Sequence, residues 1–180
     1  MRARAVAILA VAAVVLSWGT ARAVLGNPST VNRYAIIDGD TFALLAKRCF
    51  WTLLKLGCPA QRLRLEGADA FESAQTCRDA SGAVWPCGAV ATERLRQLVN
   101  RPDFTCNIDP EFIDRHAREF AVCYADGQDV GATMVREGLA FAFGRDTQYL
   151  PLENQAKEAK RGGWAGQFVR PQYFRQGAIE

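Results

Sequence analysis

The sequence predicts a single α+β domain of modest size that follows an export signal. Strand-like segments come first along the chain, and helix-like segments then alternate with strands, an order typical of α+β domains. About 157 residues remain after the first 23, which is the size of one domain with its own hydrophobic core. The chain contains no internal repeat, heptad pattern or low-complexity linker that would divide it further.

Residues 1–23 have the features of a secretory signal peptide. Two arginines precede an apolar run over residues 5–18, and Ala21-Arg22-Ala23 offers a small-x-small cleavage site. We therefore expect cleavage after this site, a mature domain over residues 24–180, and a secreted or periplasmic location. The apolar run is shorter than the roughly 20 residues that span a bilayer. An uncleaved membrane anchor is the alternative; without it, we expect a monomer with no stable membrane partner.

The export signal also accounts for the basic charge of the chain. The whole sequence has 22 Lys and Arg against 19 Asp and Glu, a formal net charge of +3. Residues 1–23 contain three of these arginines and no acid, so residues 24–180 have 19 basic and 19 acidic residues. The overall charge therefore supplies no field to attract nucleic acid, and any such binding must depend on a local basic patch.

The first predicted strands flank a tight turn. Residues 31–38 and 41–46 are apolar runs separated by Asp38-Gly39-Asp40, a sequence typical of a reverse turn. Residues 61–67 alternate apolar and charged side chains, the period of a half-exposed strand. Between them lies the apolar excursion Leu45–Pro59, which we expect to pack on the domain; a contact surface is the alternative.

The second half of the chain predicts three helices and two further strands. Apolar residues at helical spacing predict a helix over residues 89–100, which Pro102 ends. Shorter segments complete the pattern: strands at 104–108 and 119–124, and helices at 130–137 and 152–161. We expect the aromatic residues of the C-terminal stretch to pack against the domain; a strand-binding surface, with the nearby Arg170 and Arg175, is the alternative.

Six cysteines fit an exported protein stabilised by disulfides. An even number of cysteines in an oxidising compartment favours disulfide pairing, although several pairings are possible. Structural zinc is disfavoured because the chain has no Cys-x-x-Cys and a single histidine. Pairing between neighbours in the sequence is the simplest arrangement: Cys77–Cys87, Cys106–Cys123 and, less firmly, Cys49–Cys58.

Three short clusters carry the candidate chemistry. They are Asp38-Gly39-Asp40-Thr41, the segment Arg64–Glu72, and Asp114-Arg115-His116-Ala117-Arg118. Their aspartates are oxygen ligands of the kind that calcium and magnesium prefer, and their arginines have planar guanidinium groups that match phosphate oxygens. A glutamate in the second cluster could orient or deprotonate a water. A cation, a base and paired guanidinium groups together can hydrolyse a phosphodiester.

In this order, the clusters resemble the thermonuclease family, the staphylococcal nuclease-like enzymes. The resemblance runs from about Val31 to Trp164 and includes Tyr124–Gly127, Met134–Ala140 and Gly163-Trp164. It implies a five-stranded Greek-key β-barrel of the OB type with about three helices. It also implies a calcium-dependent endonuclease, since OB barrels commonly present a face and loops to nucleic-acid strands.

The resemblance also implies a role for each residue of the first two clusters. Asp40 and Asp69 would bind calcium together with the main-chain carbonyl of Ala70. Asp38 and Thr41 would support these ligands from outside the coordination sphere.

The remaining candidates would act on water or on phosphate. Glu72 would position or activate the attacking water, and Arg64 and Arg118 would contact the scissile phosphate. Arg115 and His116 are candidate substrate contacts. A surface strand position for Arg64, and a hairpin salt bridge between Arg118 and Asp114, are the structural alternatives.

The sequence departs from the family pattern at three positions. Ala117 stands where the family has glycine, in a turn that favours a positive φ. His116 replaces a tyrosine, and Phe71 replaces a proline, which we expect to make the metal-binding loop less rigid.

We therefore expect an exported calcium-dependent endonuclease that hydrolyses DNA with little sequence specificity. RNA is a second candidate substrate. The alternative is a non-catalytic OB-fold module that binds nucleic acid or protein.

Overall fold

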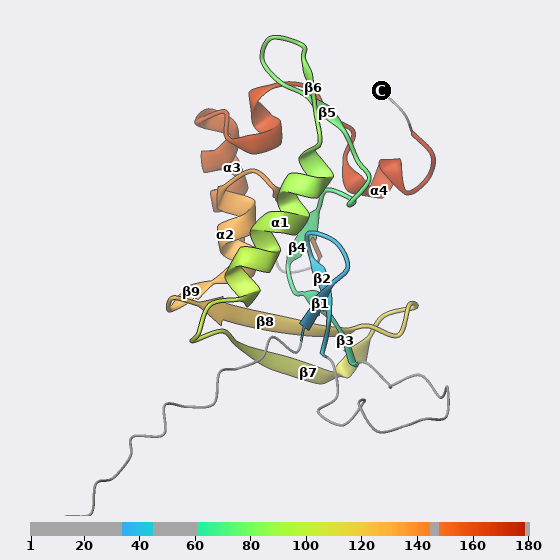
Figure 1. The fold of residues 1–180 in the computed structure, drawn as a ribbon, viewed down its shortest axis with the longest axis vertical. Helices are drawn as coiled ribbons and strands as arrows, with labels where there is room; N and C mark the ends of the chain where they lie inside the picture. The colour runs from blue at the N-terminus through green and yellow to red at the C-terminus, as the bar shows by residue number, and fades with distance from the viewer. Residues whose placement is uncertain (1–33, 45–60, 145–147, 179–180) are drawn as a thin grey trace, which may run out of the picture.

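The computed structural model describes residues 34–44, 61–144 and 148–178 (Figure 1). The predicted signal peptide, the Cys49–Cys58 pair and the whole Leu45–Pro59 excursion lie outside these residues and stay predictions. Within the described part of the chain, no helix is long and apolar enough to cross a membrane.

The main sheet contains the five strands that position the candidate site. Its order is β1-β2-β3-β8-β7, and a short strand, β9, also pairs with β8. β3 and β8 run parallel, and the other neighbours are antiparallel. The bounds are β1 Tyr34–Ile36, β2 Thr41–Leu44, β3 Gln61–Leu65, β7 Thr105–Ile113, β8 Glu119–Ala125 and β9 Gln128–Asp129. Within the described residues, each of the predicted strands at 31–38, 41–46, 61–67, 104–108 and 119–124 overlaps a strand of this sheet.

Two small sheets were not predicted. β4 (Ala68–Ala70) follows β3 after one turn and pairs with β10 (Ala140–Ala142). β5 (Cys77–Arg78) and β6 (Val84–Trp85) form a hairpin. The β4–β10 pairing matters for the site because it fixes the main chain on both sides of Asp69.

The helices gather on one side of the long β7–β8 pair (Figure 1). α1 is Cys87–Val99, α2 is Val130–Arg136 and α3 is Leu150–Glu158. These three helices confirm the predictions to within three residues at each end. A 3-10 turn, η2 (Gly162–Ala165), and a one-turn helix, α4 (Pro171–Phe174), follow and were not predicted.

The core lies between the sheet and the helices. Phe42 and Leu63 from the sheet pack with Leu95 of α1 and Met134 of α2, and all four are almost fully buried. Burying a side chain of this size stabilises the fold by about 1.5–3 kcal/mol. The predicted alternation along β3 holds only in part: Leu63 and Leu65 are buried and Arg62 is exposed, but Arg64 is buried as well.

A second group of aromatic rings attaches the C-terminal segment. Phe71 is fully buried, and its ring lies edge-on against Phe141 and Phe168. Trp164 contacts the latter two rings in turn. The expected packing of the C-terminal aromatics is confirmed for Trp164 and Phe168, but it is wrong for Tyr173, which is exposed. Phe71 also anchors the loop after β4 in the core, in place of the looser loop expected from the loss of proline.

Both disulfides that fall within the described residues are formed as predicted. Cys77 pairs with Cys87, which connects β5 to the first residue of α1. Cys106 pairs with Cys123, and these residues lie directly opposite each other in the β7–β8 register.

Candidate active site

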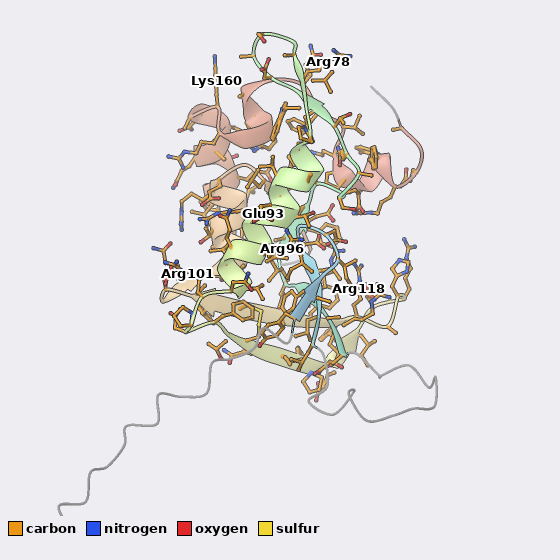
Figure 2. All side chains as sticks on the ribbon, viewed as in Figure 1. Arg78, Glu93, Arg96, Arg101, Arg118 and Lys160 are labelled. Carbon is orange, nitrogen blue, oxygen red and sulfur yellow. A yellow bond between two sulfur atoms is a disulfide. The ribbon has the colours of Figure 1, made fainter. Side chains whose placement is uncertain are left out.

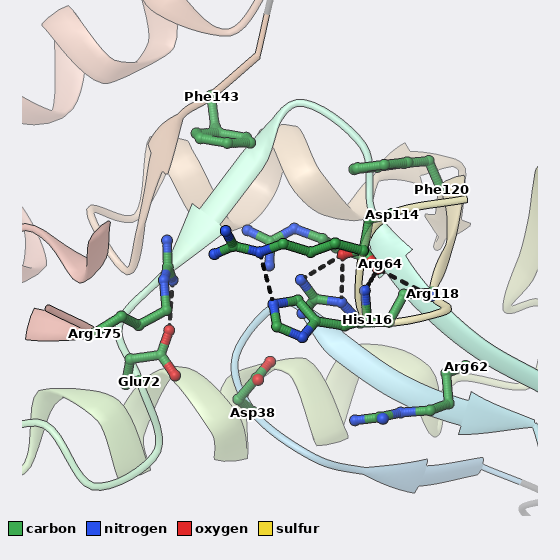
Figure 3. A pocket seen from close by; sticks show the side chains of 11 residues that line it. Asp38, Arg62, Arg64, Glu72, Asp114, His116, Arg118, Phe120, Phe143 and Arg175 are labelled. Carbon is green, nitrogen blue, oxygen red and sulfur yellow. Dashed lines mark hydrogen bonds and ion pairs between the residues drawn. The ribbon is translucent and has the colours of Figure 1, made fainter. Parts of the chain in front are cut away.

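The three predicted clusters meet at one pocket of about 540 Å³ (Figure 3). β3 contributes arginines to its wall, the turn between β7 and β8 contributes a second set, and the segment after α4 contributes one more. Five arginines line the pocket: Arg62, Arg64, Arg115, Arg118 and Arg175. Three carboxylates, one imidazole and two phenyl rings complete the wall: Asp38, Glu72, Asp114, His116, Phe120 and Phe143.

The two predicted metal-binding aspartates converge on one buried arginine. Nη2 of Arg64 lies 3.0 Å from Oδ2 of Asp40 and 2.6 Å from Oδ1 of Asp69. The three residues are only 3–5% exposed. A surface strand position for Arg64 is therefore excluded. Although burial alone would lower the pKa of Arg64, the charges of both aspartates raise it.

Asp40 is fixed by hydrogen bonds to its two neighbours in the first cluster and to the main chain of Ala70. Oδ1 of Asp40 accepts a hydrogen bond from the Thr41 hydroxyl (2.7 Å), and Oδ2 accepts one from the main-chain N–H of Ala70 (3.1 Å). The Asp40 N–H donates to Oδ1 of Asp38 (3.1 Å). Gly39 allows this approach, because a Cβ there would lie 2.7 Å from that of Ala70. Asp38 and Thr41 thus contact Asp40 as the resemblance implied.

This cluster concentrates negative charge away from water. Burial raises the pKa of Asp40 to about 7, because the opposing charge of Arg64 does not offset the loss of hydration. The neighbouring Asp38 and Asp69 raise it further. A cation bound beside these carboxylates would compensate that charge.

The donor groups at this point suit a hard divalent cation. Asp40 and Asp69 offer carboxylate oxygens, and the main chain of Ala70 lies beside Asp40. Calcium and magnesium prefer such oxygen ligands. Among the residues that the structure describes, no three His, Cys, Asp or Glu side chains lie close enough together to hold a metal ion, at this site or elsewhere. At this site, Arg64 pairs with both Asp40 and Asp69, and Arg175 pairs with both Asp69 and Glu72.

Arg118 reaches the same cluster from the opposite side of the pocket. Its Nη1 donates to the Thr41 hydroxyl at 3.0 Å, so Thr41 connects it to Asp40. Arg118 also pairs with Asp114, with Nη2 at 2.7 Å from Oδ2. Arg118 therefore forms the hairpin salt bridge and also lines the pocket, and its contact with phosphate stays a prediction. Although burial opposes it, the hydrogen bonds from Arg118 and His116 lower the pKa of Asp114 to about 2.

The turn that carries Arg118 has the strain expected from its sequence. Ala117 has a φ of 55°, a conformation that costs a non-glycine residue about 1–2 kcal/mol. Oδ1 of Asp114 holds the turn by accepting the N–H groups of His116 (2.8 Å) and Arg118 (3.0 Å). The side chains of Arg115 and His116 are exposed at the rim, with Arg115 Nε at 3.1 Å from His116 Nε2.

Glu72 lies on the pocket wall, but its carboxylate already has a partner that the sequence did not predict. Arg175 Nη1 lies 2.5 Å from Glu72 Oε1 (Figure 3). The same Nη1 lies 3.1 Å from Asp69 Oδ1, and Nη2 lies 3.1 Å from Asp69 Oδ2. Arg175 follows a one-turn helix and is 103 residues from Glu72. No periodic pattern or motif in the sequence signals a contact of this kind.

Comparison with known proteins places this site in a family. Residues 62–166 match the staphylococcal nuclease homologue (SNase) family, so the chain belongs to it. The family domain is an OB-fold, which confirms the predicted five-stranded OB-type barrel.

Curated relatives include two endonucleases. Endonuclease YncB and the SPbeta prophage-derived endonuclease YokF, both of Bacillus subtilis, are 30% identical over 93 residues, which is 47% of this chain. That region covers 44% of YncB and 31% of YokF, so the chain spans less than half of either. The succinoglycan biosynthesis protein ExoI of Rhizobium meliloti is 28% identical over 162 residues, 89% of this chain and 72% of that protein.

Proposed function

We propose that this protein is an exported, calcium-dependent endonuclease that hydrolyses DNA, and as a second substrate RNA, with little sequence specificity. One observation carries the proposal. Arg64 joins the buried Asp40 and Asp69, while Arg118 reaches the same cluster through Thr41. This cluster borders the pocket that Glu72 also lines, in a chain whose relatives include endonucleases.

The arginines would bind the phosphate of the scissile bond. Arg64 enters the pocket from β3 and Arg118 from the turn between β7 and β8, so a phosphate between them could accept hydrogen bonds from both. Guanidinium groups held by Asp40, Asp69 and Asp114 need little reorganisation when negative charge builds on the phosphate oxygens.

Glu72 would position the attacking water and accept its proton. The water oxygen forms a new bond to phosphorus while one ester P–O bond breaks and its oxygen leaves with the departing strand. A calcium ion held by Asp40, Asp69 and the carbonyl of Ala70 would supply Lewis-acid polarisation of the phosphate. Little sequence specificity is expected because the pocket arginines match the backbone rather than the base edges.

Two disulfides support export to an oxidising compartment. Cleavage of residues 1–23 and a secreted or periplasmic location remain part of the proposal.

Removal of calcium is the direct test of this function. The purified mature protein should nick supercoiled plasmid DNA with calcium present and stop when a chelator is added. Asp40→Asn should abolish the calcium-dependent nicking, whereas Asp103→Asn, the same change outside the pocket, should retain it. DNA binding without cleavage under any divalent ion would contradict the proposal and favour the non-catalytic module.

A further inference from the structure

Arg175 contacts two of the proposed functional carboxylates, yet the proposed mechanism gives Arg175 no role. Its guanidinium group grips both oxygens of Asp69 and one oxygen of Glu72. The Arg175 side chain is 35% exposed, whereas that of Asp69 is 5% exposed. A partly exposed cation therefore covers a buried carboxylate.

The position of Arg175 is fixed by the segment that precedes it. Pro171, the first residue of α4, is fully buried, and the Arg175 N–H donates to its carbonyl at 2.9 Å. Just before α4, Arg170 pairs with the buried Glu153 and lies over the ring of Phe141. The carbonyl of Val169 accepts a hydrogen bond from the Gln75 side chain at 2.6 Å. The domain thus holds the start of this segment, while the Arg175 side chain is partly exposed to solvent.

These contacts conflict with both proposed roles of the carboxylates. Asp69 cannot offer an oxygen freely to a divalent cation while both its oxygens bind Arg175. Oε1 of Glu72 lies 2.5 Å from Nη1 of the same arginine, and this ion pair makes the carboxylate a weaker base towards water. Arg175 therefore binds Asp69 where the proposed calcium ion would bind, and it binds Glu72 where the proposed attacking water would bind.

We propose that Arg175 is a tethered cation that a divalent ion must displace from Asp69 and Glu72, so that the segment after α4 sets the cation affinity of the site. This inference rests on the proposed function, because it takes Asp69 as a metal ligand. Displacement releases Glu72 to meet water. It also leaves a third guanidinium group on the wall that already carries Arg64 and Arg118.

Calcium affinity measured by isothermal titration calorimetry tests this competition without using activity. Arg175→Gln should bind calcium roughly tenfold more tightly than the wild type, because the ion no longer displaces a charge-assisted contact. Arg175→Lys should lie between the two, since a lysine keeps the charge but not the two-pronged contact. Lys160→Gln removes the same charge at a site away from the pocket and should leave the affinity unchanged (Figure 2).

Thermal unfolding separates competition from a purely structural role. In chelator, Arg175→Gln should lower the Tm, because Asp69 keeps its buried charge with one partner fewer. In saturating calcium the difference from the wild type should shrink, because the tighter-binding variant gains more stability from the ion. An equal loss of Tm in both conditions would overturn the proposal, since it is the result expected of a simple structural ion pair.

The outcomes also separate this proposal from the function on which it rests. Equal or weaker calcium affinity in Arg175→Gln, with calcium-dependent DNA cleavage intact, overturns the role of Arg175 alone. Calcium affinity that is unchanged by Asp40→Asn overturns both, because the ion then binds elsewhere.

Discussion

Thr41 links Asp40 to Arg118 through hydrogen bonds. Its hydroxyl donates to Asp40 and accepts from Arg118, and the residue is fully buried. Because one hydroxyl serves both neighbours, the position of Arg118 depends on the cluster of acids as well as on its own ion pair with Asp114. A single ion pair near the surface contributes little stability, so a purely structural role in the pair with Asp114 predicts a small effect of losing Arg118. A role at the acid cluster, which Arg118 reaches through Thr41, predicts a large effect on activity.

Arg118→Ala should therefore reduce kcat by about 100-fold, the typical cost of removing a preorganised contact to developing charge. Asp114→Asn removes only the paired charge and keeps an oxygen for the turn, so it should have a much smaller effect. Arg101→Ala is the matched control, because Arg101 pairs with Asp126 at 2.6 Å on a part of the molecule away from Arg118 (Figure 2). Steady-state cleavage of a labelled duplex measures all three; equal losses in Arg118→Ala and Asp114→Asn would reduce Arg118 to a structural role.

At the scale of elements, the start of α1 supports the loop that carries Glu72. The Gly88 N–H donates to the carbonyl of Gln75, and the Gln75 N–H donates to the carbonyl of Glu72. The Cys77–Cys87 disulfide holds the two segments together on the other side. A Cβ on Gly88 would lie 1.7 Å from the carbonyl oxygen of Glu72, so the helix and the loop meet only because this residue is glycine.

Gly88→Ala should displace the Glu72 loop and lower both stability and activity. We expect a loss of about 1–3 kcal/mol in the free energy of unfolding, the usual cost of forcing extra atoms into a packed site. Urea unfolding measures that loss, and cleavage assays on the folded fraction should show a reduced kcat. Ala89→Ser enlarges the next, exposed residue and should change neither quantity. Full activity and stability in Gly88→Ala would show that the loop does not depend on this contact.

At the scale of the whole molecule, the charge on the predicted mature chain is balanced, and the candidate site has a local concentration of basic side chains. Five arginines line it, and Arg64 and Arg175 are already engaged by acids. Arg62 and Arg115 are exposed at its edge and form no ion pair with the acids of the cluster, so they could meet neighbouring phosphates without rearranging it.

DNA binding should consequently show a modest dependence on salt. Each phosphate neutralised changes the slope of log K against log salt by about 0.9. Arg62→Gln and Arg115→Gln should each reduce the slope by roughly 1, whereas Arg101→Gln should leave it unchanged. Fluorescence anisotropy over a salt series, in chelator to prevent cleavage, measures the slope. A slope equally insensitive to all three changes would place the DNA on another face.

The sequence predicted the local features of the site better than the distant ones. Asp40, Arg64 and Asp69 lie in short segments whose strand register brings them together, since Thr41 lies opposite Arg64. The strained φ of Ala117 followed from one substitution within a turn. These features depend on residues near one another in the sequence or on a simple strand pairing.

The features that the sequence did not predict depend on long-range packing. β4 is three residues long and becomes a strand only by pairing with β10, about 70 residues later. Arg175 reaches Asp69 across 106 residues, after a helix of one turn that has no measurable period. Such contacts are decided by where the aromatic cluster places the C-terminal segment, which no local pattern encodes.

The central claim is that Glu72 acts on water beside a phosphate held by Arg64 and Arg118. Single-turnover cleavage of a labelled DNA duplex, with enzyme and calcium in excess, tests it most directly. Glu72→Gln should slow cleavage by about 100-fold or more, because the amide keeps the shape of the side chain but cannot take a proton. Glu111→Gln is the same change at an exposed position on β7 and should keep the wild-type rate. Wild-type cleavage by Glu72→Gln would contradict the account.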